Sequence, residues 1–237
     1  WRHGACRAGR GRAGTGGDTL AVANGQPLDG HMIRVVDPAT GVACGPGVPG
    51  ELWVRGPTVS RGYWGQPEAT AAAFGAQLTG EERAGSFLRT GDIGTIVDGE
   101  VYVLGRLKEL IILRGRNHYA QDLEAEVADS HTSLQADSTI AFGLDDGGAE
   151  QLVIVQELTR AALRALDAPA LFTAIRQALV EAYEVAPHAI VLVRPGSLPR
   201  TSSGKLQRLA ARAQFRASTL VAVAEWRESA DRAELAG

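Results

Sequence analysis

One of only two lysines in this chain stands in a segment suited to binding an anion. Among the 24 lysines and arginines, only Lys108 and Lys205 are lysines. A compact ammonium can approach two oxygens at once in places where a planar guanidinium does not fit. A genome that prefers arginine codons would give the same bias without any functional cause. Lys205 follows a Thr-Ser-Ser-Gly run, so its surroundings decide between the two interpretations.

The segment around Lys205 contains Gly-Lys but does not match the phosphate loop of nucleotide hydrolases. Residues 198–208 read Leu-Pro-Arg-Thr-Ser-Ser-Gly-Lys-Leu-Gln-Arg. The phosphate loop needs a glycine where this chain has Pro199, and a serine or threonine where it has Leu206. The Gly-Lys pair must therefore serve another purpose.

Lys205 is expected at the start of a final helix. Ser202 or Ser203 is a suitable cap, and the apolar face of the helix would contain Leu206, Leu209 and Ala213. The free N–H groups and dipole of a helix start favour a phosphate or carboxylate near Lys205. The alternative is an ordinary surface lysine in a capping segment.

Two more polar motifs are weak when taken singly. In residues 89–92 (Arg-Thr-Gly-Asp), an aspartate after a glycine turn could accept hydrogen bonds from a ribose diol, although a plain β-turn has the same sequence. In residues 105–113, Arg106 and Lys108 precede an apolar strand at the point where the pattern of short strands gives way to an α+β pattern. An exposed linker would look the same.

The elements that must position these motifs fall into two regions. Residues 20–107 read as short strands, at 32–36, 51–55, 87–89 and 101–104, with one short helix at 67–74. This pattern predicts a small β-barrel-like subdomain.

Residues 108–218 read as an α+β domain. We expect strands at 110–113, 139–142, 152–155 and 190–193, and a helix at 122–128 capped by Asp122. A longer helix opens at Asp167 and Pro169, with Leu171, Phe172, Ile175 and Leu179 on one face. Residues 1–19 and 219–237 are expected to be tails, the first of them disordered or poorly placed because it is rich in Gly, Arg and Ala.

Composition excludes several classes of protein. The net charge of −3 argues against a dedicated nucleic-acid binder. Cys6 and Cys44 can form neither a disulfide framework nor a zinc site, and no other metal motif occurs. No run of 18 apolar residues could span a membrane, and no secretory signal is visible. A cytoplasmic protein without a bound metal is therefore expected.

Taken together and in order, the motifs resemble the carboxyl-terminal part of the adenylate-forming (AMP-binding) superfamily, over about residues 28–216. Within it, the chain most resembles the fatty acyl-AMP ligase branch. The motifs that carry the resemblance are Gly-Glu-Leu-Trp-Val-Arg-Gly (50–56), Gly-Tyr-Trp (62–64), Arg-Thr-Gly-Asp (89–92), Arg-Gly-Arg-Asn-His-Tyr (114–119), Gln-Asp-Leu-Glu (121–124) and Ser-Ser-Gly-Lys-Leu-Gln-Arg (202–208).

The resemblance assigns roles to five residues. Lys205 matches the catalytic lysine of the family and also contacts the nucleotide. Asp92 matches the ribose-binding aspartate, and Arg106 matches an arginine near the ribose and phosphates. Lys108 matches the hinge on which a mobile α+β lid domain swings, and Gly115 matches a glycine of the thiol tunnel.

The resemblance also implies a reaction. A fatty acid and ATP would give acyl-AMP and pyrophosphate, with Mg²⁺ arriving on the ATP phosphates. The acyl group would then pass to a thiol of an acyl carrier protein, or of a carrier domain of a polyketide or peptide synthase. The family's phosphate loop and acyl pocket are absent from these 237 residues, so the chain is expected to be inactive alone. The alternatives are an acyl-CoA synthetase fragment, with CoA as acceptor, and a non-catalytic truncated remnant.

Overall fold

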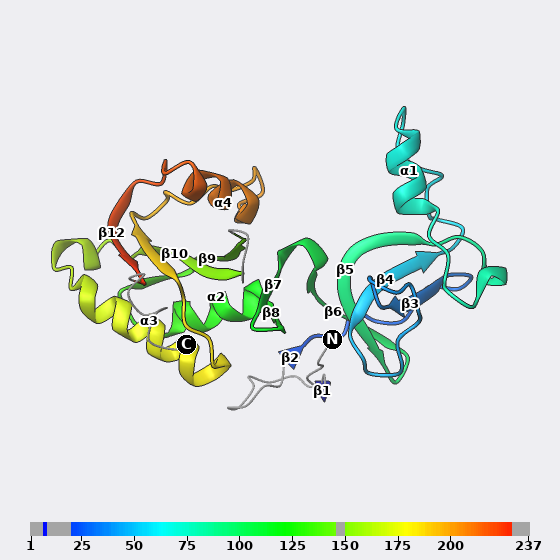
Figure 1. The fold of residues 1–237 in the computed structure, drawn as a ribbon, viewed down its shortest axis with the longest axis horizontal. Coiled ribbons are helices and arrows are strands. Elements are labelled where there is room, and N and C mark those ends of the chain that lie inside the picture. The colour runs from blue at the N-terminus through cyan, green and yellow to red at the C-terminus, as the bar shows by residue number, and fades with distance from the viewer. Residues whose placement is uncertain (1–6, 9–19, 146–149, 229–237) are drawn as a thin grey trace, which may run out of the picture. The chain divides into compact units, whose positions relative to one another are not determined.

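A computed structural model describes residues 7–8, 20–145 and 150–228 (Figure 1). The chain divides into two compact units, Trp1–Lys108 and Glu109–Gly237. Apart from strand β1 (Arg7–Ala8), which pairs in parallel with β2 (Leu20–Ala21), the expected tail at 1–19 lies outside the described residues. In the described part of the chain, no helix combines the length and apolarity needed to cross a bilayer.

The first unit is built on one antiparallel sheet in the order β3-β4-β5-β6. Its strands are β3 (Met32–Val36), β4 (Gly50–Arg55), β5 (Leu88–Val97) and β6 (Glu100–Arg106). Alternate residues point to opposite faces: Val36 and Trp53 pack with Phe87 on one side, while Val35 and Leu52 pack with Val101 on the other. Within the described residues the sheet is open, with β3 and β6 at its edges, so the barrel-like expectation is realised as a curved sheet that does not close.

Helix α1 (Pro67–Phe74) projects from this sheet, contacts it at β5 and buries none of its residues (Figure 1). Pro67 opens it, as expected for a residue that lacks an N–H. The rings of Tyr63 and Phe74 pack in a T-shaped arrangement, with 5.2 Å between the ring centroids. A short 3₁₀ turn, η1 (Glu82–Ala84), leads back into β5.

The second unit contains a four-stranded sheet in the order β12-β11-β10-β9. Strands β9 (Leu134–Leu144) and β10 (Gln151–Leu158) are antiparallel, whereas β10 and β11 (Ala189–Val193) are parallel. A hairpin of β7 (Leu110–Leu113) and β8 (Arg116–Tyr119) precedes it, after the 3₁₀ turn η2 (Leu107–Glu109). A further 3₁₀ turn, η3, spans Ala162–Arg164.

Both faces of this second sheet are covered by helices (Figure 1). Helices α2 (Ala120–Asp129) and α3 (Ala168–Tyr183) pack on one face, which presents Ile154 and Ile190. Helix α4 (Arg208–Arg216) packs on the other, where Val153 and Val191 contact its residues. Continuous apolar runs in β10 and β11 follow from this double burial. The predicted α+β class is confirmed.

Of the predicted caps of helices α2 and α3, one is confirmed and one is corrected. Asp167 caps α3 by accepting a hydrogen bond from the Ala170 amide at 3.1 Å, as predicted. Helix α2 begins at Ala120, two residues before the expected cap, so Asp122 lies inside its first turn.

The expected carboxyl-terminal tail at 219–237 is corrected in part. Its residues Ala222–Arg227 form β12, which adds antiparallel to β11. Trp226 on this strand lies under the guanidinium of Arg176, 4.4 Å from the ring centroid. Backbone pairing and this contact hold the strand against the sheet. Residues 229–237 lie outside the described part.

Candidate functional site

Asp92 is presented by an irregularity inside a strand, and not by the free β-turn that its sequence suggests. In the pairing of β4 with β5, Glu51 lies opposite Ile93 and Trp53 opposite Arg89. Two steps along β4 thus oppose four along β5, which makes a bulge at Thr90, Gly91 and Asp92. Gly91 has a φ of +71°, a conformation that other residues adopt at a cost. The bulge breaks the regular ladder next to Asp92.

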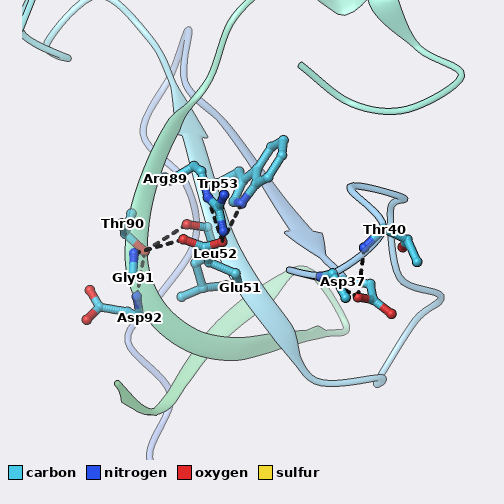
Figure 2. Close-up of polar contacts among 10 residues, drawn as sticks. Asp37, Thr40, Glu51, Leu52, Trp53, Arg89, Thr90, Gly91 and Asp92 are labelled. Carbon is cyan, nitrogen blue, oxygen red and sulfur yellow. Dashed lines mark hydrogen bonds and ion pairs between the residues drawn. The ribbon is translucent and has the colours of Figure 1, made fainter. Parts of the chain in front are cut away.

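The bulge is tied to β4 by a buried carboxylate (Figure 2). Glu51 is 2% exposed. Its Oε1 accepts a hydrogen bond from the Gly91 amide at 3.1 Å, and its Oε2 accepts from Arg89 Nη2 at 2.7 Å. Trp53 Nε1 donates to the same Oε2 at 3.0 Å. A buried charge of this kind is stable only when it is paired and hydrogen-bonded.

Thr90 fixes the other side of the bulge. Its hydroxyl donates to the Leu52 carbonyl at 2.7 Å and accepts from the Asp92 amide at 3.0 Å. The backbone on both sides of Asp92 is therefore bound to β4, while Figure 2 shows the Asp92 carboxylate directed away from Glu51. The carboxylate is left available for partners outside the sheet.

The structure brings together two of the residues that the sequence selected. Asp92 and Arg106 lie opposite each other in the pairing of β5 with β6. Asp92 Oδ1 and Arg106 Nε are 2.9 Å apart, and both side chains reach the surface. A carboxylate can accept about four hydrogen bonds, so this ion pair orients Asp92 and leaves acceptor capacity for a diol. The arrangement can bind a polar, partly anionic ligand.

Lys205 lies in a closed loop before α4, which corrects the expected helix start. Helix α4 begins at Arg208 with Gln207 at its N-cap, so neither Ser202 nor Ser203 caps it. Residues 200 and 206 instead form an isolated antiparallel bridge. The Thr201 amide donates to the Lys205 carbonyl at 2.8 Å, and the Lys205 amide donates to Thr201 Oγ1 at 3.0 Å.

The Lys205 loop is braced by Arg200. Its Nη1 donates to the Gly204 carbonyl at 3.1 Å, and its Nη2 donates to Ser138 Oγ at 3.0 Å. Glu157, which is buried, accepts from the Leu198 amide at 2.9 Å at the start of the loop. Lys205 itself is exposed and takes part in no ion pair within the described ranges. The backbone of the loop is thus held in place, while the ammonium group of Lys205 is exposed and able to bind an anion.

The far end of the Lys205 loop is tied down by Arg208. Its Nη1 donates to Glu109 Oε2 at 2.7 Å, and its Nε and Nη2 bind the two oxygens of Glu124 at 2.7 and 2.6 Å. Glu124 also accepts from the Ala141 amide of β9 at 3.0 Å. Burial raises the pKa of Glu124, and the hydrogen bonds from Arg208 offset this only in part. The same hydrogen bonds raise the pKa of Arg208.

Lys108 and Gly115 flank the first hairpin of the second unit. Lys108 lies in η2, at the boundary of the two units. Arg114 and Gly115, with φ of +50° and +74°, form the two-residue turn between β7 and β8. A Cβ on Gly115 would meet no atom within 4 Å, so the glycine is needed here for its backbone conformation.

His118 is a buried structural residue in this hairpin. Its Nε2 has no hydrogen-bond partner among the described residues, and its ring meets Tyr183 edge-on, 6.3 Å between centroids. Burial, followed by the charge of Arg116, lowers the pKa of His118. These surroundings favour a structural role for His118.

Sequence reasoning missed the residues that hold the site together. Glu51, Arg200 and Arg208 were all part of recognised motifs, but none was given a role. For Glu51 the available signal was a charged residue within an apolar strand, which burial turns into a hydrogen-bonding centre. No group of three or more metal-binding side chains occurs in the residues that the structure describes.

Two family models match the chain. The AMP-binding enzyme family matches residues 11–64, and the AMP domain of the Disco-interacting protein 2-like type matches residues 108–225. The first match includes β3 and β4 with Glu51. The second includes the hairpin, strands β9 to β11, most of β12 and the Lys205 loop.

Individual relatives point in the same direction. The medium-chain-fatty-acid–[acyl-carrier-protein] ligase JamA of Moorena producens is 41% identical over 201 residues, which are 85% of this chain and 34% of JamA. The long-chain-fatty-acid–AMP ligase FadD26 of Mycobacterium tuberculosis is 37% identical over 205 residues, 84% of this chain and 34% of FadD26. This chain therefore spans about a third of the length of these relatives.

A solved structure shares the fold. It comes from work on fatty acyl-adenylate ligases of E. coli and L. pneumophila, and it superposes with a TM-score of 0.66 at 30% sequence identity. The superposition covers 84% of this chain and 33% of the other. This chain thus shares its fold with about a third of that solved structure.

Proposed function

Because the chain belongs to the AMP-binding enzyme family, we propose that it carries the ribose-binding and lysine-bearing part of a ligase that activates a fatty acid with ATP. The observation that carries the proposal is the Asp92–Arg106 pair, in which two family positions meet at 2.9 Å on a fixed bulge. The likeness to fatty acid ligases supports the choice of a fatty acid as the substrate.

In the proposed reaction, an oxygen of the fatty acid carboxylate attacks the α-phosphorus of ATP. The new bond joins that oxygen to phosphorus, and the bond from phosphorus to the leaving pyrophosphate breaks. Both reactants are anions, so much of the barrier is electrostatic. A cation that touches both groups stabilises the crowded transition state more than the separated reactants.

Lys205 is the proposed cation. It is exposed, it takes no part in an ion pair among the described residues, and its loop is held by Arg200. Asp92 would accept hydrogen bonds from the ribose hydroxyls, and Arg106 would lie toward the ribose and phosphates. Mg²⁺ would arrive bound to the phosphates of ATP, where it supplies positive charge. The use of ATP favours a cytoplasmic location.

The second proposed step passes the acyl group to a thiol. Lys108 would be the hinge on which the second unit moves as a lid, and Gly115 would lie beside the incoming thiol. The likeness to an acyl-carrier-protein ligase supports a carrier protein as the acceptor. Attack of the thiol sulfur on the acyl carbonyl forms the thioester and releases AMP.

The test joins this chain to the amino-terminal two thirds of the JamA ligase and measures fatty-acid-dependent exchange of pyrophosphate into ATP. We expect exchange in the joined protein and none in the 237-residue chain alone, which lacks the family's phosphate loop. Lys205→Ala should reduce the rate about 10²–10³-fold, whereas Arg212→Ala on the following helix α4 should not. Full exchange by the Lys205→Ala variant would contradict the proposed role of Lys205. Turnover by the 237-residue chain alone would contradict its expected inactivity.

The acceptor is tested with the same joined protein. We expect a thioester on a carrier protein that bears a phosphopantetheine arm. If acyl-CoA forms in preference to the thioester on the carrier protein, the acceptor is CoA and the proposed carrier-protein acceptor is wrong. Lys108→Ala should slow this thiol step while leaving pyrophosphate exchange intact, and equal loss of both steps would contradict the hinge.

A further inference from the structure

The buried carboxylate of Glu51 has no place in the reaction proposed above, yet it is one of the most completely bonded charges in the first unit. It accepts four hydrogen bonds, from Trp53 Nε1, from Nε and Nη2 of Arg89, and from the Gly91 amide. Within the described part of the chain, the backbone hydrogen bond that this carboxylate accepts comes from Gly91, which precedes Asp92. The carboxylate thus joins a charged network to the bulge that presents the nucleotide-facing residue.

The bulge requires such a partner. Extra residues on one strand leave backbone N–H groups without a ladder acceptor, and an unpaired buried N–H is costly. Glu51 supplies an acceptor for Gly91, and Thr90 supplies one for Asp92. Removing the Glu51 acceptor frees Gly91, whose φ of +71° is only one of several conformations open to a glycine.

Freedom at Gly91 would be transmitted to Asp92. Hydrogen bonds to two hydroxyls of a diol require the carboxylate to be held to within a fraction of an ångström. The charge on Glu51 matters as well as its shape. A glutamine of the same size can accept from Gly91 only by turning its amide donors toward Arg89, where donor would face donor.

We propose that Glu51 is a positioning residue, which fixes Asp92 through Gly91 and thereby sets the selectivity of the chain for a nucleotide with an intact ribose diol. The inference rests on the proposed function, because it takes Asp92 as the ribose-binding residue. It adds a determinant that lies behind the binding surface and does not touch the nucleotide.

The test measures the affinity of the 237-residue chain for AMP and for 2′,3′-dideoxy-AMP by NMR titration. We expect AMP to bind about tenfold more tightly or better, as loss of hydrogen bonds to a charged acceptor implies. In Glu51→Gln this ratio should fall to near one, while binding of the dideoxy nucleotide stays the same. A general loss of fold would weaken both nucleotides alike and leave the ratio in place.

Asp37→Asn is the matched control. Asp37 also holds a backbone turn of the first unit, accepting from the Ala39 and Thr40 amides at 2.8 and 3.3 Å, but at the β3–β4 loop (Figure 2). Its substitution should leave the ratio unchanged. A ratio that falls equally in Asp37→Asn would overturn the specific role of Glu51.

The Asp92→Asn variant distinguishes a failure of the positioning role of Glu51 from a failure of the proposed ribose site. If this variant loses the preference for AMP and Glu51→Gln keeps it, the positioning role is wrong and the proposed function stands. If Asp92→Asn keeps the preference, or the unaltered chain does not respond to AMP, the proposed ribose site fails and the inference falls with it.

A measurement on the unaltered chain covers the case in which Glu51→Gln does not fold. A scalar coupling across the hydrogen bond, from Gly91 nitrogen to the Glu51 side-chain carboxyl carbon, should be detectable and should persist when AMP binds. Its absence would overturn the inference without any substitution.

Discussion

Arg208 binds Glu109 across 99 positions of the chain, at 2.7 Å between Nη1 and Oε2. Glu109 directly follows Lys108, and Arg208 is the first residue of α4 after the Lys205 loop. Since Arg208 also binds Glu124 of α2 with two hydrogen bonds, one guanidinium joins the start of the second unit, a helix of its core and the end of the loop. The end of the Lys205 loop is thus held to Glu109, the first residue of the second unit, which follows the proposed hinge in the sequence.

Arg208→Met should destabilise the chain by about 3 kcal/mol, because it leaves two partly buried carboxylates without a cation. Arg208→Lys should cost less but not nothing, since an ammonium cannot reproduce the fork to Glu124. Denaturant unfolding followed by circular dichroism measures both. Arg212→Met on the same helix should stay within about 0.5 kcal/mol of the unaltered chain. Equal stability of the Arg208 and Arg212 variants would show that the cluster contributes nothing.

Stability should fall when the pH drops below the ordinary pKa of histidine, because burial lowers the pKa of His118 in the folded chain. Between the unfolded pKa of about 6.5 and the lower folded value, the unfolded chain binds a proton that the folded chain does not. The stabilisation from neutral His118 is therefore complete above about pH 6.5 and is lost as pH falls through the folded pKa. Thermal unfolding between neutral and mildly acidic pH measures the effect. His118→Phe should flatten this dependence while His131→Gln should not, and an unchanged slope in His118→Phe would rule out this cause.

Gly115→Ala should destabilise the hairpin by about 1 kcal/mol, because a φ of +74° is costly for a residue with a Cβ. Nothing lies within 4 Å of the added atom, so the cost is one of conformation and not of collision. Gly115→Asn should cost less, since asparagine tolerates this region. Gly45→Ala, which also adds a Cβ into open space, is the matched control and should be near neutral. Equal melting temperatures for the Gly115→Ala and Gly45→Ala chains would contradict this account.

Lys205→Ala should leave the free energy of unfolding within about 0.5 kcal/mol of the unaltered chain, since exposed side chains without partners contribute little. Arg200→Met should instead loosen the loop by removing the donor to the Gly204 carbonyl. Hydrogen exchange of the Lys205 amide, which bonds to Thr201, reports this loosening. Faster exchange is expected in Arg200→Met and not in Lys205→Ala. The reverse order would show that the lysine, and not the arginine, holds the loop.

Much of the second unit could be read from the sequence because its signals are local. The helical spacing of apolar residues in α3 and the Asp167 cap both act between neighbouring turns of one helix. The apolar runs of β9, β10 and β11 indicate strands that are buried on both faces. The family motifs likewise selected Asp92, Arg106 and Lys205 as candidate site residues without any coordinates, and their roles stay predictions.

Other features depended on contacts far apart in the chain. Residues 222–227 form a strand only because the edge of β11 is available for pairing, and Trp226 lies under Arg176. Lys205 lies in a closed loop because Thr201 accepts its amide hydrogen bond and Arg200 binds Gly204.

The order of the residues by itself determined the α+β class, the family and the identity of the side chains available for chemistry. The tertiary structure alone decided how those side chains are held. Residues 89–92 read as a turn because Gly and Asp favour one locally. They become a bulge within β5 because Glu51, 40 positions earlier, accepts the Gly91 amide in a buried site. A hydrogen bond between residues so distant has no local signature, since folding alone brings the carboxylate to the amide and removes the competing water.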